Sequence, residues 1–167
     1  ELPKGLDNRG FFGRIYCETT FLENGLPCHW PQMNFSVNRQ RGTVRGMHWQ
    51  AEPYAEAKFV FPVAGAVCDV VVDLREESRD FGQPQSFELS VDNPRGLYVP
   101  EGCAHGFQTL VDNTVLIYLM GCAYHPEVSR GFCWNDPAFG ITWPLEVTQI
   151  SEKDKNWPAY PIEGGER

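Results

Sequence analysis

The sequence has little positive charge. Fourteen Lys and Arg residues stand against 22 Asp and Glu residues, so the 167-residue chain carries a net charge of −8. Proteins that bind nucleic acid need a basic surface to contact phosphates, and this balance argues against that class. An anionic small molecule remains compatible with the composition, because a few local Arg and Lys side chains are enough to hold it.

Other common signals are missing as well. The six cysteines include no Cys-x-x-Cys pair, so the spacing of a zinc site is absent. The 167 residues show no Gly-rich dinucleotide fingerprint, no signal-peptide pattern and no apolar run of membrane-spanning length. Several cysteines lie in strand-like runs, where a free thiol packs as a small apolar group. We therefore expect reduced cysteines and a cytoplasmic protein that does not associate with membranes.

Helical periodicity is also scarce, while turn residues and aromatics are plentiful. The chain holds 16 Gly and 13 Pro, and 13% of its residues are aromatic. Short apolar or alternating runs between Gly and Pro turns predict an all-β jelly-roll barrel or sandwich formed by one domain over residues 1–167. A short helix is expected at Glu18–Asn24, and an irregular tail at Asn135–Arg167 with an N-cap at Ser151. The predicted strands are Gly10–Cys17, Gln32–Val37, Thr43–Gln50, Lys58–Val63, Ala66–Leu74, Gln85–Leu89, Gly96–Val99, Phe107–Leu110 and Thr114–Cys122.

The segment Gly42–Gln50 carries the first polar side chains that could do chemistry. Strand alternation would place Arg45, Met47 and Trp49 on one face and Gly46, His48 and Gln50 on the other. With Lys58 on the next strand, the His48 face could line a barrel with polar groups. A lone strand histidine can equally be a core residue whose ring is satisfied by hydrogen bonds, so position alone leaves both readings open.

The second polar segment is a turn followed by a histidine. Pro-Glu-Gly-Cys-Ala precedes His105, which places this side chain at a strand start near a barrel mouth, or in hydrogen bonds to the loop backbone. Taken alone, Tyr118 is typical of a core tyrosine and Asp154 of a surface carboxylate. Each segment offers a single histidine, whereas a stable metal site needs three or four ligands. We therefore predict no metal, and the missing dinucleotide fingerprint leads us to predict no cofactor either.

Ordered motifs along nearly the whole chain resemble those of one family. From about Asp7 to Pro158 the chain is similar to the dTDP-4-dehydrorhamnose 3,5-epimerases, a branch of the cupins. This resemblance implies a cupin-type jelly roll, a homodimer and cofactor-free epimerisation of a nucleotide-linked 4-keto-6-deoxy sugar. The motifs are Asp7-Asn8-Arg9-Gly10-Phe11-Phe12, Gln32-Met33-Asn34-Phe35-Ser36, Val44-Arg45-Gly46-Met47-His48-Trp49-Gln50, Tyr98-Val99-Pro100-Glu101-Gly102-Cys103-Ala104-His105-Gly106-Phe107, Trp134-Asn135-Asp136-Pro137 and Ile150-Ser151-Glu152-Lys153-Asp154.

The resemblance also implies roles for individual residues. His48 matches the general base, Asp154 the carboxylate that orients it, Tyr118 the acid on the opposite face of the sugar, and Lys58 the cation beside the keto oxygen. In the family's dimers the first strand reaches the partner's site, so residues near the N-terminus are expected to act across the interface. The residues that match substrate-binding positions are Arg9, Phe12, Gln32, Asn34, Arg45 and His105.

The substrate is expected to be dTDP-4-dehydro-6-deoxy-D-glucose, with dTDP-4-dehydro-L-rhamnose as product. The segment Gly121–Tyr124 offers one aromatic where some family members have two near the nucleotide base, so the identity of the base stays open. Two alternatives remain: an epimerase that inverts only carbon 3 or only carbon 5 of a related nucleotide sugar, and a non-catalytic sugar-binding cupin. A metal-dependent cupin oxygenase is disfavoured by the missing histidine pair.

Overall fold

Short antiparallel strands make up most of the structure. This computed structural model describes residues 4–160, so the ends of the predicted 1–167 domain lie outside the described residues. The helical segments within that range are α1 (Glu18–Glu23), the 3-10 turn η1 (Pro126–Val128) and α2 (Glu152–Lys155). The strands are β1 (Lys4–Asp7), β2 (Gly10–Gly13), β3 (Gln32–Asn38), β4 (Val44–Gln50), β5 (Lys58–Ala64), β6 (Ala66–Asp73), β7 (Pro84–Ser90), β8 (Leu97–Val99), β9 (Cys103–Thr109), β10 (Thr114–Met120) and β11 (Ser129–Gly131).

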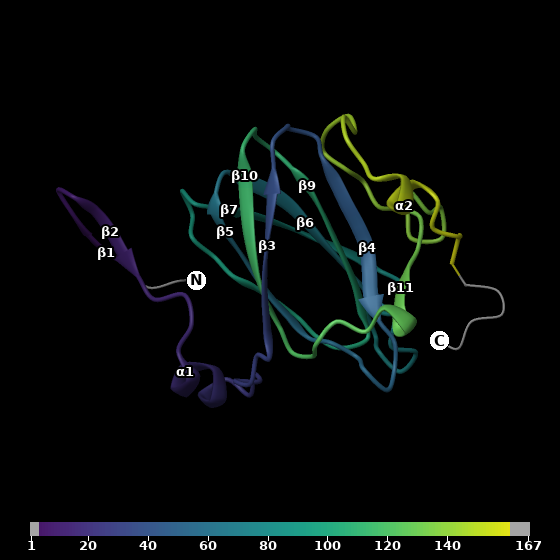
Figure 1. Cartoon of the computed structure of the whole chain (residues 1–167), viewed down its shortest axis with the longest axis horizontal. Coiled ribbons are helices and arrows are strands. Elements are labelled where there is room, and N and C mark those ends of the chain that lie inside the picture. Colours follow the sequence, from purple (N-terminus) through teal and green to yellow (C-terminus); the bar gives the residue numbers. More distant parts are fainter. Residues whose placement is uncertain (1–3, 161–167) are drawn as a thin grey trace.

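Nine of these strands form two sheets that together make a barrel. One sheet has the order β3-β10-β5-β8 and the other the order β11-β4-β9-β6-β7, with every pair of neighbours antiparallel. The remaining pair, β1 and β2, forms a separate hairpin that projects away from the barrel (Figure 1). The predicted all-β, cupin-type jelly roll is confirmed. No helix among the described residues is long and apolar enough to cross a membrane.

Apolar side chains fill the space between the sheets and also cover both outer faces. Inside, Phe107 of β9 and Leu116 of β10 are almost fully buried in one cluster. The outer face of the five-stranded sheet is covered by the C-terminal tail, whose Phe132 and Phe139 belong to the cluster around Val72. The tail is therefore part of the core, which agrees with its high content of aromatic residues. On the other sheet, the segment containing α1 covers part of the outer face, where Phe21 packs against Phe59 and Phe61 of β5.

Strand β4 departs from regular alternation, and the expected face of Arg45 was wrong. Arg45 pairs with Phe107 and His48 with His105, so three steps along β4 match two along β9. This extra residue is a β-bulge, which changes the face that the following side chains occupy. Gly46 has φ of +128°, and a Cβ there would lie 2.5 Å from the backbone of the facing strand. As a result Arg45 and His48 both line the interior cavity, whereas Met47 belongs to the outer cluster.

Several element boundaries also differ from the expectation. The predicted strand Gly10–Cys17 ends at Gly13, and β9 begins at Cys103 rather than at Phe107. β1 and β11 were not predicted, because each is short and carries no clear alternation of apolar residues. The predicted helix after the first hairpin and the N-cap at Ser151 are both present; Ser151 Oγ accepts a hydrogen bond from the Asp154 amide at 3.0 Å.

Candidate active site

A cavity of about 440 Å³ opens inside the barrel, lined by strands of both sheets and by α2. Seven of the ten predicted site residues line it, although they come from segments as far apart as β3 and the C-terminal tail. This convergence is a strong reason to regard the cavity as the active site. The seven are Asn34, Arg45, His48, Lys58, His105, Tyr118 and Asp154; Gln32, Arg9 and Phe12 do not line the cavity.

His48 and Asp154 form a short polar pair at the wall made by β4. His48 Nε2 lies 2.6 Å from Asp154 Oδ1, and the carboxylate is 5% exposed. Burial alone would raise the pKa of Asp154, yet the hydrogen bond and the charge of His48, together with the Gly46 amide, hold that pKa below its ordinary value. An ionised carboxylate only accepts hydrogen bonds, so Nε2 must donate and Nδ1 of neutral His48 carries the lone pair. The pair is arranged to present a base whose orientation is fixed.

Lys58 lies buried at the start of β5 with its ammonium group partly occupied. Nζ donates a hydrogen bond to the backbone carbonyl of His48 at 3.1 Å and forms an ion pair with Glu56 Oε1 at 3.2 Å. An ammonium group has three N–H donors. Among the described residues no third acceptor contacts Nζ, so one donor remains for an oxygen atom in the cavity.

Tyr118 faces the cavity from β10, in the sheet opposite His48. Burial, and to a smaller extent the negative charge of Asp69, raise the pKa of Tyr118 well above its ordinary range. The phenol therefore stays protonated at neutral pH and can act as a proton donor. The ring of His105 lies edge-on to it, with 6.2 Å between ring centroids.

Asp69 is a site residue that the sequence reasoning missed. It is fully buried on β6, and its Oδ1 lies 2.8 Å from His105 Nε2. The missed signal was the single acidic residue in the otherwise apolar run Ala66–Val72, because a buried carboxylate requires a polar or charged partner. Two histidine–carboxylate pairs thus lie at the cavity, with His48, Asp154 and His105 in its lining and Asp69 behind His105. The cavity-lining residues Glu56 and Lys153 were missed as well.

Gln32 and Asn34 lie together on β3 at the edge of the cavity. Gln32 Nε2 donates to Asn34 Oδ1 at 3.1 Å, and Gln32 Oε1 accepts a hydrogen bond from the backbone amide of Tyr124 at 3.1 Å. Tyr124 lines the cavity and is 54% exposed. Gln32 therefore contacts the site through its neighbours, holding an exposed aromatic ring at the rim.

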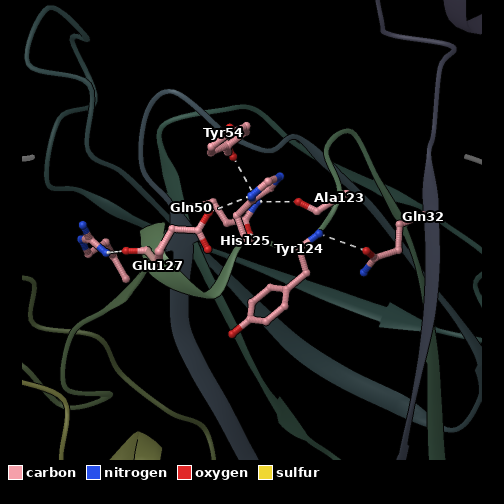
Figure 2. A network of polar contacts seen from close by, with 8 residues as sticks. Gln32, Gln50, Tyr54, Ala123, Tyr124, His125 and Glu127 are labelled. Atoms are coloured by element: carbon pink, nitrogen blue, oxygen red, sulfur yellow. Dashed lines mark hydrogen bonds and ion pairs between the residues drawn. The ribbon is translucent and has the colours of Figure 1, made fainter.

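Gln50 fixes the same rim loop from β4. Its Oε1 accepts a hydrogen bond from the His125 amide at 2.6 Å, while its Nε2 donates to the backbone carbonyls of Tyr54 and Ala123 (Figure 2). The His125 ring stacks on Tyr54 with 3.6 Å between centroids. These contacts join the loop that carries Tyr124 to the strand that carries His48.

Arg9 and Phe12 lie on the projecting hairpin, outside the cavity of their own chain (Figure 1). The Arg9 guanidinium pairs with Asp7 at 2.6 Å, with 90% of its side chain exposed. Phe12 is 86% exposed. The predicted binding role of this hairpin across an interface stays a prediction. No cluster of three or more His, Cys, Asp or Glu among residues 4–160 is arranged to hold a metal ion.

Comparisons with known proteins agree on one family. Residues 2–161 match the sequence profile of dTDP-4-dehydrorhamnose 3,5-epimerase. A dTDP-4-dehydrorhamnose 3,5-epimerase of Sinorhizobium fredii is 44% identical over 154 residues, which is 92% of this chain and 79% of the relative.

Solved structures support the same assignment. The epimerase of Bacillus anthracis str. Ames with TDP and PPi bound has a TM-score of 0.92 and 38% identity, covering 95% of this chain and 91% of that one. The 3'-monoepimerase ChmJ of Streptomyces bikiniensis, in complex with dTDP-quinovose, has a TM-score of 0.88 and 30% identity, with 95% and 80% covered. With fold, cavity and sequence in agreement, the chain belongs to the dTDP-4-dehydrorhamnose 3,5-epimerase family.

Proposed function

We propose that this family member converts dTDP-4-dehydro-6-deoxy-D-glucose to dTDP-4-dehydro-L-rhamnose by inverting carbons 3 and 5. The observation that carries the proposal is the placement of two proton carriers on opposite sheets around one cavity. The pair His48–Asp154 lies on one side and Tyr118 on the other. Inversion requires a proton to leave one face of the carbon and another to arrive on the opposite face, so this arrangement meets the minimum need.

The first step is removal of a proton beside the ketone. The carbonyl at carbon 4 acidifies the hydrogens on carbons 3 and 5, and Nδ1 of His48 takes one of them while Asp154 stabilises the imidazolium. Negative charge then develops on the keto oxygen, where the remaining donor of Lys58 stabilises it. Tyr118 returns a proton from the opposite face. The sequence of steps uses only side chains of this cavity.

The nucleotide part of the substrate requires positive charge, which the cavity supplies despite the acidic chain. Arg45, Lys58 and Lys153 all line it. Arg45 is oriented by a hydrogen bond from its Nε to Asn38 at 2.8 Å. Guanidinium and ammonium groups bind diphosphate oxygens strongly when they are preorganised in this way. The TDP bound to the Bacillus anthracis relative supports thymidine as the nucleoside.

We also propose a homodimer built on strand β3. This strand forms one edge of its sheet, and its outward side chains Met33, Phe35 and Val37 are 68%, 75% and 52% exposed. An apolar edge strand of this kind is normally covered. A second copy would cover it, and would allow Arg9 and Phe12 of each chain to approach the partner's cavity. Light scattering should give twice the chain mass for wild type and one chain mass for Phe35→Glu.

A cytoplasmic location belongs to the same proposal. All six cysteines are free thiols, and five of them are only partly buried. Accessible free thiols are typical of reducing compartments.

A single-centre epimerase is the second candidate, favoured by the likeness to the 3'-monoepimerase ChmJ. Proton NMR of the 4-keto sugar nucleotide with purified protein in deuterium oxide separates the two functions. Deuterium at carbons 3 and 5, with an L-sugar product that a reductase can trap, supports the 3,5-epimerase. Deuterium at one carbon supports the second candidate, and absence of exchange with wild-type protein would contradict both.

A further inference from the structure

Glu56 is a buried carboxylate on the cavity wall for which the proton-transfer scheme has no role. It precedes β5, is 9% exposed and lines the cavity beside Lys58. Its Oε1 forms the ion pair with Lys58 Nζ, but its Oε2 is buried without a hydrogen-bond partner among the described residues. Leaving a buried charged oxygen unpaired is costly, so such an atom in a binding site points to a donor supplied by the ligand.

The position of Glu56 next to Lys58 restricts which donor this is. An ammonium donor and a carboxylate acceptor lie side by side, 3.2 Å apart at their closest atoms. A ketone beside a hydroxyl group offers the complementary pair, an acceptor and a donor on adjacent carbons. In a 4-keto-6-deoxy sugar, carbon 3 carries a hydroxyl next to the keto carbon, whereas carbon 5 carries only the ring oxygen and the methyl group.

We propose that Glu56 accepts a hydrogen bond from the 3-hydroxyl of the sugar while Lys58 donates to the keto oxygen, so that the pair recognises the α-hydroxyketone. This inference rests on the proposed epimerase function and assigns a specificity role within the same cavity. Glu56 then accelerates the reaction at carbon 3 more than the reaction at carbon 5. The difference follows from the shape of the two enolates.

Removal of the carbon 3 proton makes carbon 3 planar and brings its hydroxyl into the plane of the enolate oxygen. The Lys58–Glu56 pair can then hold both oxygens together, so the contact with Glu56 strengthens as the transition state forms. Removal of the carbon 5 proton leaves the 3-hydroxyl on a tetrahedral carbon. Its bond to Glu56 is then equal in ground and transition states and cannot accelerate the reaction.

The test is the ratio of deuterium exchange at carbon 3 to that at carbon 5 in Glu56→Met, read from the same NMR spectra. Methionine keeps the length of the side chain but removes both oxygens. We expect the ratio to fall at least about tenfold, since a hydrogen bond to a charged group is at stake. Exchange is started separately from substrate and from doubly inverted product, so that the order in which the centres react does not set the ratio.

Three variants serve as comparisons. Glu56→Gln keeps an acceptor oxygen and should restore the ratio toward wild type. Lys58→Met should slow both centres alike, because both enolates place charge on the same keto oxygen. Glu88→Met makes the same substitution on the exposed face of β7 and should leave both rates unchanged. Thermal unfolding establishes that each variant is folded.

Equal slowing of both centres in folded Glu56→Met would overturn the proposal, because Glu56 would then act only by placing Lys58. An unchanged ratio with unchanged rates would overturn it as well. Failure of the proposed function itself looks different, since wild-type protein would then exchange neither proton.

Discussion

Replacing Asp154 with Asn tests the histidine–carboxylate pair with little change in shape. The wild-type contact to His48 Nε2 is 2.6 Å long, and the Asp154 side chain is 7% exposed while that of His48 is 37% exposed. The charge-assisted hydrogen bond is therefore shielded from water mainly on the carboxylate side. Losing the carboxylate removes stabilisation of the imidazolium worth about 3 kcal/mol, which corresponds to roughly a 100-fold slower proton abstraction. The amide can also present its NH2 group to Nε2, which would favour the tautomer with a proton on Nδ1 and no base toward the cavity.

The assay is the initial rate of deuterium exchange at carbons 3 and 5 with saturating substrate. Both rates should fall together by about 100-fold, because one base serves both centres in the proposed mechanism. The matched control is Glu152→Gln, which removes a carboxylate from the same helix at a side chain that is 81% exposed. Circular dichroism and the thermal midpoint establish that both variants are folded. A folded Asp154→Asn protein within threefold of wild type would refute the assigned role of the pair.

Three further outcomes are expected. Tyr118→Phe should lose inversion at one or both centres while exchange continues, as followed by NMR; loss of exchange together with inversion would give Tyr118 another role. Arg75 bonds the carboxylate of Asp73 and lowers its pKa below the ordinary 3.8, so this pair stabilises the fold above that pH and the contribution disappears as the pH falls. The difference in unfolding free energy between wild type and Asp73→Asn should therefore shrink from about pH 5 to pH 2, and a constant difference in urea titrations would contradict it. Hydrogen bonds at the start of α1 lower the pKa of Cys17, whereas burial and the carboxylate of Asp73 raise the pKa of Cys103 to about 11. Iodoacetamide at neutral pH should therefore alkylate Cys17 before Cys103. Peptide mass spectrometry that shows the reverse order would contradict this.

Sequence periodicity predicted the barrel strands because most of them bury one face in the interior. The runs at β5, β6 and β10 are apolar enough to mark their bounds within a residue or two. The bulge in β4 was not predictable in this way, since it depends on a pairing between β4 and β9 that lie far apart in the sequence. Gly46 was the local sign that something unusual occurs there, because its backbone conformation is rarely adopted by other residues.

The site could be predicted in part by the same reasoning and in part only by resemblance. Periodicity suggested His48, Gln50 and Lys58 as polar residues facing a barrel interior, and all three line the cavity, although it placed Arg45 on the opposite face. Nothing local marked Asp154 as more than a surface carboxylate; its neighbours became visible only in the folded chain. Asp69 was open to physical reasoning, since an acid flanked by apolar residues in the middle of a buried strand needs a partner. Glu56 was less visible, because its burial depends on how the loop before β5 packs.

The proposed base is assembled only when the C-terminal tail docks on the barrel. His48 and Asp154 are 106 positions apart in sequence, and the tail is joined to the barrel edge by the Val44 amide, which donates to Gln149 at 2.8 Å. Further along the tail, Trp157 packs directly on Gly131 of β11, where any Cβ would meet the indole ring. The aromatic residues of the tail thus contribute to stability and also determine where the carboxylate lies. Substitutions at Gly131 should consequently slow proton exchange even though this residue lies outside the cavity lining.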